Sequence, residues 1–383
     1  MSASDLLRAS LLRTASLLYS TVRPLIFSRS AQQTHHDILA LLTRLDASDA
    51  ACEALTLLNQ YAFKMRPIIA GGVDLPYPLM LAAGFVKGHG FDSETTALHV
   101  VHDGINIMPG WRSVPALLGP VEFGSFTRWP RTGNPGTVIW RDVPTRSTQN
   151  RVGLRNPGAT AAAAFLKARQ NQLPAVYGIN IATSPGIDDL DEENQHVQES
   201  LLTFLANGLF PSWFTLNLSC PNTEDDPQNR QTAAQAQLLC RTAVNTLREY
   251  RATAGREIPL WVKVSPELAA AQYKVLMHTF AETGVHAVVA TNTLGSPAPD
   301  QPTLTAGIGG GRLHQQAVGA VRRLCVIQQQ SELPVDIIGC GGVQDPVSYQ
   351  RFQLNGAVAA QYWSALVFGG PLAAAAILDE IHN

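Results

Sequence analysis

From about residue 76 onward, short apolar or β-branched runs alternate with longer stretches of helical periodicity. Eight such runs predict strands, at residues 78–84, 121–127, 175–182, 213–219, 260–265, 286–291, 335–340 and 357–362. Nearly continuous apolar strands separated by helices are typical of a parallel sheet that is covered on both faces. Eight repeats over about 300 residues favour an α/β fold closed as a (β/α)8 TIM barrel with an N-terminal helical extension, and an open doubly wound sheet is the alternative.

The N-terminal part of the chain has a different, helical pattern. Residues 1–36 are rich in Arg, Ser and Leu and contain a single acid, Asp5. A second helical pattern covers about residues 35–64, with a break near residues 47–49. We therefore predict an N-terminal helical domain at residues 1–66 and a barrel domain at residues 67–383. Three interpretations of the first segment stay open: a helix on an anionic membrane, a cleavable organellar transit peptide, or a helix packed on the barrel.

The composition narrows the class of protein. Of the 383 residues, 45% are hydrophobic and 15% are charged, and the formal net charge is −2. These values exclude a disordered chain, a collagen and a basic nucleic-acid coat, so we expect no nucleic-acid partner. No window reaches the ~18 uninterrupted apolar residues of a membrane-spanning helix. The five cysteines form no CxxC pair, so we expect no disulfide framework and no metal site.

Polar residues gather where the predicted strands end. They are Lys87 after the first run, Asn180 in the third, Asn217 and Asn222 at the fourth, Lys263 in the fifth, Asn292 after the sixth and Ser364 after the eighth. In a barrel the carboxyl ends of the strands meet at one mouth, which is where active sites lie. Buried amides cost ~1–3 kcal/mol each if they stay unpaired. The repeated asparagines therefore predict a polar, planar ligand at this mouth.

Two glycine clusters, GIGGG at 307–311 and GCGG at 339–342, each precede a helical stretch. Bare backbone N–H groups at the start of a helix favour an anion, because they converge there and the helix dipole adds to the attraction. Barrels often hold a phosphate beside strands seven and eight. We therefore expect a phosphate-bearing cofactor whose polar ring meets Asn180, Asn217 and Lys263.

A set of motifs in the predicted barrel resembles dihydroorotate dehydrogenase. The motifs are LAAGFVK at 81–87, NRVGLRN at 150–156, GINI at 178–181, NLSCPNT at 217–223, VKV at 262–264, ATNT at 290–293 and IGCGG at 338–342. Their order and spacing hold over about residues 76–380. The resemblance implies an FMN-bearing (β/α)8 barrel that oxidises (S)-dihydroorotate to orotate in de novo pyrimidine biosynthesis.

The N-terminal helices resemble those of the membrane-associated, quinone-dependent class 2 of this family. The resemblance rests on YSTVRPLIF at 19–27, followed by His35. It implies a peripheral membrane protein on the cytoplasmic face of the bacterial inner membrane or on the mitochondrial inner membrane. It also implies a tunnel through which a membrane quinone reaches the flavin, with His35, Arg141 and Trp363 around the quinone.

The resemblance also implies roles for individual residues. The substrate-binding residues would be Lys87, Asn150, Asn217, Asn222, Asn292 and Thr293, and Cys220 would be the catalytic base. The FMN-binding residues would be Ala83, Gly84, Ser125, Asn180, Asn217, Lys263, Thr291, Gly311, Gly341, Gly342 and Ser364.

Several residues depart from the class 2 pattern. Cysteine at position 220 is typical of the soluble class 1 enzymes, whereas class 2 enzymes usually carry serine. A thiol with an ordinary pKa of ~8.5 is a better base at neutral pH than a serine hydroxyl, so Cys220 is chemically competent. Acids stand at 224–226, in the loop that the resemblance implies would close over the substrate, and Arg155 stands where the family commonly has an asparagine.

These departures leave two other functions open. One is an FMN barrel that oxidises or reduces a different dihydropyrimidine or an enoate, or that uses a soluble acceptor. The other is a non-catalytic barrel that binds a pyrimidine, a flavin or a phosphate as a sensor or scaffold. The sequence leaves open the oligomeric state and whether residues 1–18 are cleaved.

Overall fold

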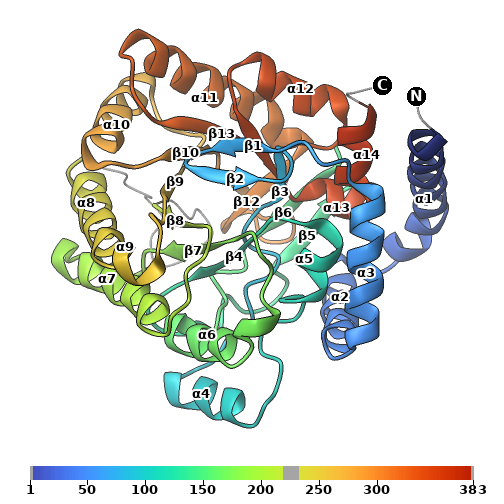
Figure 1. Ribbon diagram of the computed structural model, residues 1–383, viewed down its shortest axis with the longest axis horizontal. Helices are drawn as coiled ribbons and strands as arrows, with labels where there is room; N and C mark the ends of the chain where they lie inside the picture. Colours follow the sequence, from blue (N-terminus) through green and yellow to red (C-terminus); the bar gives the residue numbers. More distant parts are fainter. Residues whose placement is uncertain (1–2, 219–232, 381–383) are drawn as a thin grey trace.

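A closed barrel of eight parallel strands forms the centre of the molecule in a computed structural model, which describes residues 3–218 and 233–380 (Figure 1). The barrel strands are β3 (Leu79–Leu81), β4 (Val121–Phe126), β7 (Tyr177–Ala182), β8 (Trp213–Asn217), β9 (Leu260–Val264), β10 (Ala287–Ala290), β13 (Asp336–Cys340) and β14 (Ala359–Tyr362). Each lies within one of the eight predicted runs. Strand β10 pairs with both β9 and β13, so the sheet has no free edge there. The barrel prediction is confirmed, and the open sheet is excluded.

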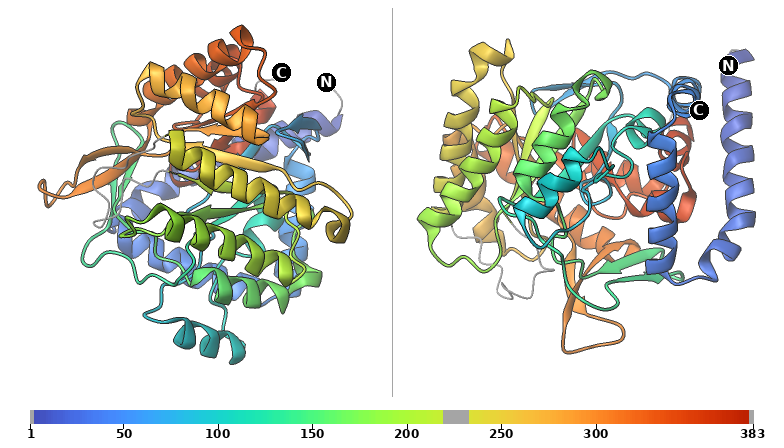
Figure 2. Two further views of the ribbon diagram at one scale, coloured as in Figure 1. Left: turned by 90° about the vertical axis from the view of Figure 1, so that its left-hand side faces the viewer. Right: turned by 90° about the horizontal axis from the view of Figure 1, so that it is seen from below.

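Helices surround the barrel on its outer face (Figures 1 and 2). They are α4 (Glu94–His102), α5 (Ser113–Leu118), α6 (Gly158–Lys167), α7 (Leu190–Ala206), α8 (Ala233–Glu249), α9 (Arg251–Ala254), α10 (Ala270–Thr283), α11 (Gly311–Gln330), α12 (Pro346–Leu354), α13 (Ser364–Gly369) and α14 (Ala373–Glu380), with a 3-10 turn at Gln170–Gln172. Helix α8 shows why they pack: Ala236, Leu239, Cys240, Ala243 and Leu247 recur at helical spacing and are buried. The helices and the outward side chains of the strands share one apolar core.

The inward-facing side chains of the barrel form a second core. Trp213 and Trp261 stack there with ring centroids 4.5 Å apart. Strands β1 (Ile68–Ala70) and β2 (Val73–Leu75) form a hairpin whose apolar side chains join this second core. The Trp261 Nε1–H donates to the carbonyl of Gly71 at 3.0 Å. A Cβ at Gly71 would lie 2.3 Å from that nitrogen, so only glycine allows the hairpin to come so close.

A four-stranded antiparallel sheet, which the sequence pattern did not predict, lies beside the barrel. Its strands are β11 (Leu294–Pro297), β12 (Thr305–Gly310), β6 (Ser147–Asn150) and β5 (Ile139–Asp142), in that order. Strand β12 contains most of the 307–311 glycine cluster, and α11 begins at Gly311. The start of a helix at this cluster was expected, but the strand was not. Glycine-rich runs look like turns, because glycine is depleted in strands.

Three helices precede the barrel: α1 (Ala3–Phe27), α2 (Ala31–Asp46) and α3 (Asp49–Ala62). Both predicted helical patterns and the break between α2 and α3 are confirmed. The buried Asp46 carboxylate accepts the Gly110 N–H at 2.7 Å and the Ser113 N–H at 2.9 Å, which fixes the end of α2 to the segment before β4. Ala62 and Phe63, at the end of α3, belong to the same apolar core as the barrel helices. The division into two domains near residue 66 stays a prediction.

Helix α1 lies along the C-terminal helices α13 and α14 (Figure 1). The Arg8 guanidinium pairs with the Asp379 carboxylate at 3.0 Å. The Tyr19 hydroxyl donates to the Val367 carbonyl at 2.6 Å, and Arg23 donates to the Phe368 carbonyl at 2.6 Å. One face of α1 is therefore packed on the barrel domain. Of the helices in the described part of the chain, none is long and apolar enough to cross a membrane.

Candidate active site

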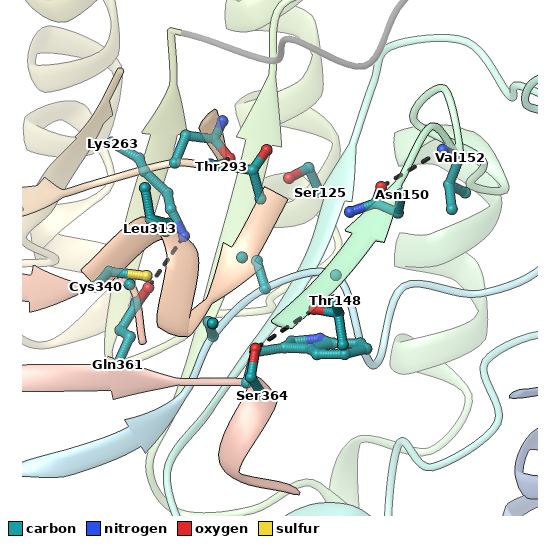
Figure 3. Close-up of a pocket in the computed structure, with 18 of the residues that line it drawn as sticks. Ser125, Thr148, Asn150, Val152, Lys263, Thr293, Leu313, Cys340, Gln361 and Ser364 are labelled. Atoms are coloured by element: carbon teal, nitrogen blue, oxygen red, sulfur yellow. Dashed lines mark hydrogen bonds between the residues drawn. The ribbon is translucent and has the colours of Figure 1, made fainter. Parts of the chain in front are cut away.

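A cavity of about 190 Å³ opens where the barrel strands end, and the antiparallel sheet forms one of its walls (Figure 3). The predicted site residues that line it are His35, Ala83, Gly84, Lys87, Ser125, Asn150, Asn180, Asn217, Lys263, Thr291, Asn292, Thr293, Gly341, Gly342, Trp363 and Ser364. They come from the ends of different barrel strands, from strand β6 and from helix α2. The structure thus brings together side chains that lie far apart in the sequence.

Two predicted site residues, Gly311 and Arg141, are not among the described residues that line this cavity, and two others fall outside the described residues. Gly311 is the first residue of α11, and Gly309 and Gly310 line the cavity in its place. The Arg141 guanidinium lies over the Phe27 ring at 4.2 Å from its centroid and donates to the Arg29 carbonyl. Arg141 therefore points toward the link between α1 and α2. Cys220 and Asn222 lie outside the described residues, as does the acidic stretch at 224–226.

Asparagine side chains form a connected group on one side of the cavity. The Asn292 Nδ2 donates to the Asn217 Oδ1 at 3.2 Å, and the Thr293 backbone N–H donates to the Asn292 Oδ1 at 2.9 Å. The Thr293 hydroxyl is buried, and among the described residues it has no hydrogen-bond partner. Such a group costs free energy unless a ligand pairs with it. The cluster can therefore bind a planar ligand that carries both donors and acceptors.

Lys263 supplies a buried positive charge at the floor of the cavity. Only 6% of this residue is exposed, and its Nζ donates to the Gln361 Oε1 at 3.3 Å (Figure 3). Burial raises the pKa of the adjacent Cys340 thiol, and the Lys263 ammonium opposes that rise. The side chain of Asn180 is also buried here, and its Oδ1 has no partner among the described residues. An acceptor and an ammonium thus face the same ligand space.

A glycine-rich cradle forms another side of the cavity. A Cβ at Gly342 would lie 2.5 Å from the Gly310 carbonyl oxygen, and a Cβ at Gly310 would lie 3.0 Å from the Ser364 hydroxyl. Neither position has room for a side chain, so bare backbone faces the cavity. The Thr148 and Ser364 hydroxyls lie 3.4 Å apart beside it (Figure 3). Bare N–H groups with hydroxyls nearby are suited to binding phosphate oxygens.

His35 and Trp363 lie on the side of the cavity that faces the N-terminal helices. Trp363 meets Phe85 edge to face, with centroids 6.1 Å apart. Burial, and then the nearby Lys87 ammonium, lower the pKa of His35 to about 4, so its imidazole is neutral near pH 7. A second, smaller cavity shares His35 and Lys87 with the first and also touches Arg155. Arg155 thus lines the smaller cavity together with Lys87 and is not among the residues that line the main cavity.

Some lining residues were missed at the sequence level. They include Thr148, Gln149, Leu313 and Gln361, whereas Gly309, Gly310 and Cys340 belong to the two glycine clusters that were expected at a phosphate. The one usable signal was a polar residue inside an apolar run, as for Gln361 in residues 357–362. Thr148 and Gln149 gave no signal, because the strand that carries them was not predicted.

Comparisons with known proteins agree with this geometry. The family model described as "Dihydroorotate dehydrogenase" matches residues 110–383. "Dihydroorotate dehydrogenase (quinone)" of Nitrosomonas eutropha is 27% identical, covering 95% of this chain and 96% of the relative. The protein of the same name from Chloroflexus aurantiacus is 29% identical, covering 94% of this chain and 95% of its own.

Solved structures support the fold independently. The crystal structure of DHODH from Eimeria tenella in complex with ferulenol superposes with a TM-score of 0.70 at 19% identity, covering 93% of both chains. The ligand-free Eimeria tenella structure gives a TM-score of 0.68 at 21% identity, covering 87% of this chain and 93% of its own. At such low identity these likenesses establish the architecture, whereas the family follows from the model that matches most of the sequence. The chain therefore belongs to the dihydroorotate dehydrogenase family.

Proposed function

We propose that the chain oxidises (S)-dihydroorotate to orotate in de novo pyrimidine biosynthesis, with FMN bound at the barrel mouth and a membrane quinone as the final electron acceptor. The observation that carries this proposal is the cavity lining. The Asn217–Asn292 pair lies in the same cavity as a glycine cradle, a buried lysine and the Thr293 hydroxyl, which has no hydrogen-bond partner among the described residues. A pyrimidine and a flavin phosphate together need that combination of groups.

The residues present fit FMN. The phosphate would be held by the backbone at Gly310, Gly341 and Gly342 and by the Ser364 hydroxyl, where no Cβ could be accommodated. The further contacts that we propose for FMN are Ala83, Gly84, Ser125, Asn180, Asn217, Lys263 and Thr291. The buried Asn180 Oδ1, which has no partner among the described residues, would accept a hydrogen bond from the ring system. FMN, when bound, supplies the acceptor for the hydride that leaves the substrate.

The substrate would lie among polar side chains that can bind both its ends. Lys87 would pair with the substrate carboxylate, and Asn150, Asn217 and Asn292 would hold the amide edges of the pyrimidine. We propose Asn222 as a further substrate contact and Cys220 as the base, both outside the described residues. The thiolate of Cys220 would take one ring proton while the neighbouring ring carbon loses a hydride, which creates the double bond of orotate.

Contact with a membrane would occur through the exposed face of α1. Leu7, Leu17, Leu18 and Leu25 are 62%, 69%, 64% and 74% exposed, and with Leu6 they cover about a third of the helix circumference at 100° per residue. Exposed leucines on one side of a basic helix are typical of helices that lie in a lipid interface. The proposed location is the cytoplasmic face of a bacterial inner membrane or the mitochondrial inner membrane.

The quinone would approach between these helices and the barrel. His35 and Trp363 line the main cavity on this side, and His35 also lines the second cavity toward α2. Arg141, stacked on Phe27, would lie at the entrance rather than beside the flavin. Electrons would thus leave on the side of the cavity that His35 and Trp363 line.

An anaerobic titration tests the proposal. The purified protein should show an oxidised flavin spectrum that bleaches on addition of L-dihydroorotate and returns on addition of a soluble ubiquinone analogue. Dihydrouracil is the matched control, because it lacks the carboxylate that Lys87 would bind, and it should bleach the flavin much more slowly. A flavin that stays oxidised with dihydroorotate would refute the substrate assignment. If the oxidised flavin spectrum returns with a soluble acceptor but not with the quinone analogue, the proposal of a quinone acceptor is refuted.

A further inference from the structure

Glu122 is a buried acid in the interior of the barrel that the proposed reaction does not use. It lies on β4, none of its surface is exposed, and it does not line the cavity. Its Oε1 accepts from the Asn180 Nδ2 at 2.6 Å. Its Oε2 accepts from the Trp213 Nε1 at 3.0 Å, the Thr215 hydroxyl at 2.8 Å and the Gln361 Nε2 at 3.0 Å. All four partners donate, so the side chain at position 122 must accept at both of its terminal atoms. A carboxylate does this, because both of its oxygens are acceptors.

The carboxylate fixes the orientation of the Gln361 amide. Gln361 lies between Glu122, which accepts its Nε2–H, and the Lys263 ammonium, which donates to its Oε1 at 3.3 Å (Figure 3). An ammonium has no acceptor, so the reverse orientation would lose both bonds. Glu122 therefore acts through Gln361 to hold the Lys263 ammonium at the cavity floor.

The same carboxylate fixes the orientation of the Asn180 amide. Because the Nδ2 of Asn180 is bound to Glu122, its Oδ1 is the group left for the cavity that Asn180 lines. That oxygen is buried, and no described residue donates to it. A buried acceptor of this kind needs a ligand N–H, and the oxidised flavin ring carries one.

We propose that Glu122 is a positioning residue that sets the hydrogen-bonding polarity of the cavity floor: it makes Asn180 present an acceptor to the cofactor and holds Lys263 through Gln361. This inference rests on the proposed function, because it takes FMN as the ligand. Glu122 itself touches neither cofactor nor substrate. Its effect on the reaction passes through the two side chains that it orients.

The substitution Glu122→Gln tests this role at nearly unchanged volume. The single amide oxygen of glutamine can replace Oε2, which accepts three bonds, and the amide nitrogen then faces Asn180. To pair with that nitrogen, Asn180 must turn its Oδ1 toward position 122 and its Nδ2 toward the cavity. The substitution should therefore change the group presented to the flavin from an acceptor to a donor.

The experiment measures FMN binding by the whole protein. Flavin fluorescence on dilution gives the Kd, and the visible spectrum reports on the surroundings of the bound flavin. We expect E122Q to raise the Kd for FMN at least tenfold and to shift the flavin absorption bands. The double variant E122Q/N180D should restore the Kd to within about threefold of wild type, because the carboxylate introduced at position 180 accepts from the amide introduced at position 122 and again offers an oxygen to the cavity. Trp213→Phe is the control, since it removes one bond to Glu122 without reaching the cavity, and should leave Kd and spectrum unchanged.

Three outcomes would overturn the proposal. An E122Q protein with wild-type Kd and spectrum would show that Glu122 orients nothing that the flavin senses. If W213F weakens FMN binding as much as E122Q does, the weaker binding of E122Q comes from a general loss of stability and not from the orientation of Asn180. If E122Q does not fold, the double variant decides, and its failure to fold or to bind FMN contradicts the inference. If the wild-type protein binds FMN but dihydroorotate does not bleach the flavin, the proposed substrate is refuted and this inference is unaffected.

Discussion

The barrel interior and helix α1 both depart from the usual rule that polar residues are exposed and apolar residues are buried, and they do so in opposite directions. The interior buries Glu122, Asn180 and Lys263, whereas α1 exposes Leu17 and Leu25. In the interior the cost of burial is offset, because the polar groups pair with one another, and each pairing fixes the direction of a side chain. On α1 nothing in the described chain covers the leucines.

This difference indicates how each region acts. A paired polar interior positions groups for one ligand, so its function depends on individual atoms. An exposed apolar face binds by area, so its function depends on the sum of several side chains. Single conservative substitutions at the barrel mouth should therefore impair its function, whereas only several substitutions together should impair membrane binding by α1.

The largest effect is expected at the mouth. Cys220→Ala should slow bleaching of the flavin by dihydroorotate by roughly 10²–10⁴, because it removes the general base. Stopped-flow absorbance measures the rate, and reoxidation of chemically reduced protein by quinone should stay at its wild-type rate. Cys52→Ala, on α3 and away from the cavity, is the matched control. Bleaching by C220A at the wild-type rate would remove Cys220 as the base.

His35, at the border between the two regions, should make stability depend on pH. Its pKa is lowered from 6.5 to about 4, first by burial and then by Lys87. Between those values the unfolded chain binds a proton that the folded chain does not, so stability falls as the pH drops from 6.5 to 4. The loss for this group is about 3 kcal/mol by pH 4. Urea unfolding of wild type and H35Q at pH 7 and pH 4 measures it.

The difference between wild type and H35Q in this loss of stability separates the contribution of His35 from that of other titrating groups. H35Q should lose about 3 kcal/mol less than wild type over this range. His99, which is exposed on α4, provides the comparison variant H99Q, and this variant should follow wild type. Parallel curves for wild type and H35Q would mean that burial of His35 has no energetic consequence.

The smallest effect is expected on α1. Leu17→Ser, Leu18→Ser and Leu25→Ser combined should weaken binding to anionic phospholipid vesicles about tenfold, since three partly inserted side chains are lost. Vesicle flotation measures binding, and flavin bleaching in solution should be unchanged. Leu354→Ser on α12, where the leucine is 85% exposed, is the control for loss of an exposed leucine. Equal vesicle binding by the triple variant and wild type would contradict the membrane assignment.

Substitution is a sharper test than removal of residues 1–66. Leu12 of α1 and Ala62 of α3 are 4% and 1% exposed and belong to the apolar core that the barrel helices share. Deletion of all three helices would therefore expose that core. The exposed leucines, by contrast, contribute little to the packing, so their loss should report mainly on lipid contact.

The sequence by itself determined the barrel, the helices and the residues at the strand ends. Each of these follows from local pattern: apolar runs mark strands, and a polar residue shortly after a run, such as Lys87 or Asn292, is expected at the mouth once the strands are parallel. Gly341 and Gly342, from the second glycine cluster, also line the cavity.

Only the tertiary structure decided which groups meet. The pairing of Glu122 with Asn180 and Gln361 depends on the register of β4, β7 and β14, and no local pattern specifies which side chains a closed barrel brings to one level. The antiparallel sheet was missed because its strands are short and rich in glycine and polar residues, so that pairing between distant segments stabilises them. For the same reason Arg141 could not be placed from sequence: it is held by Phe27 and Arg29, whose position depends on how α1 packs against the barrel domain.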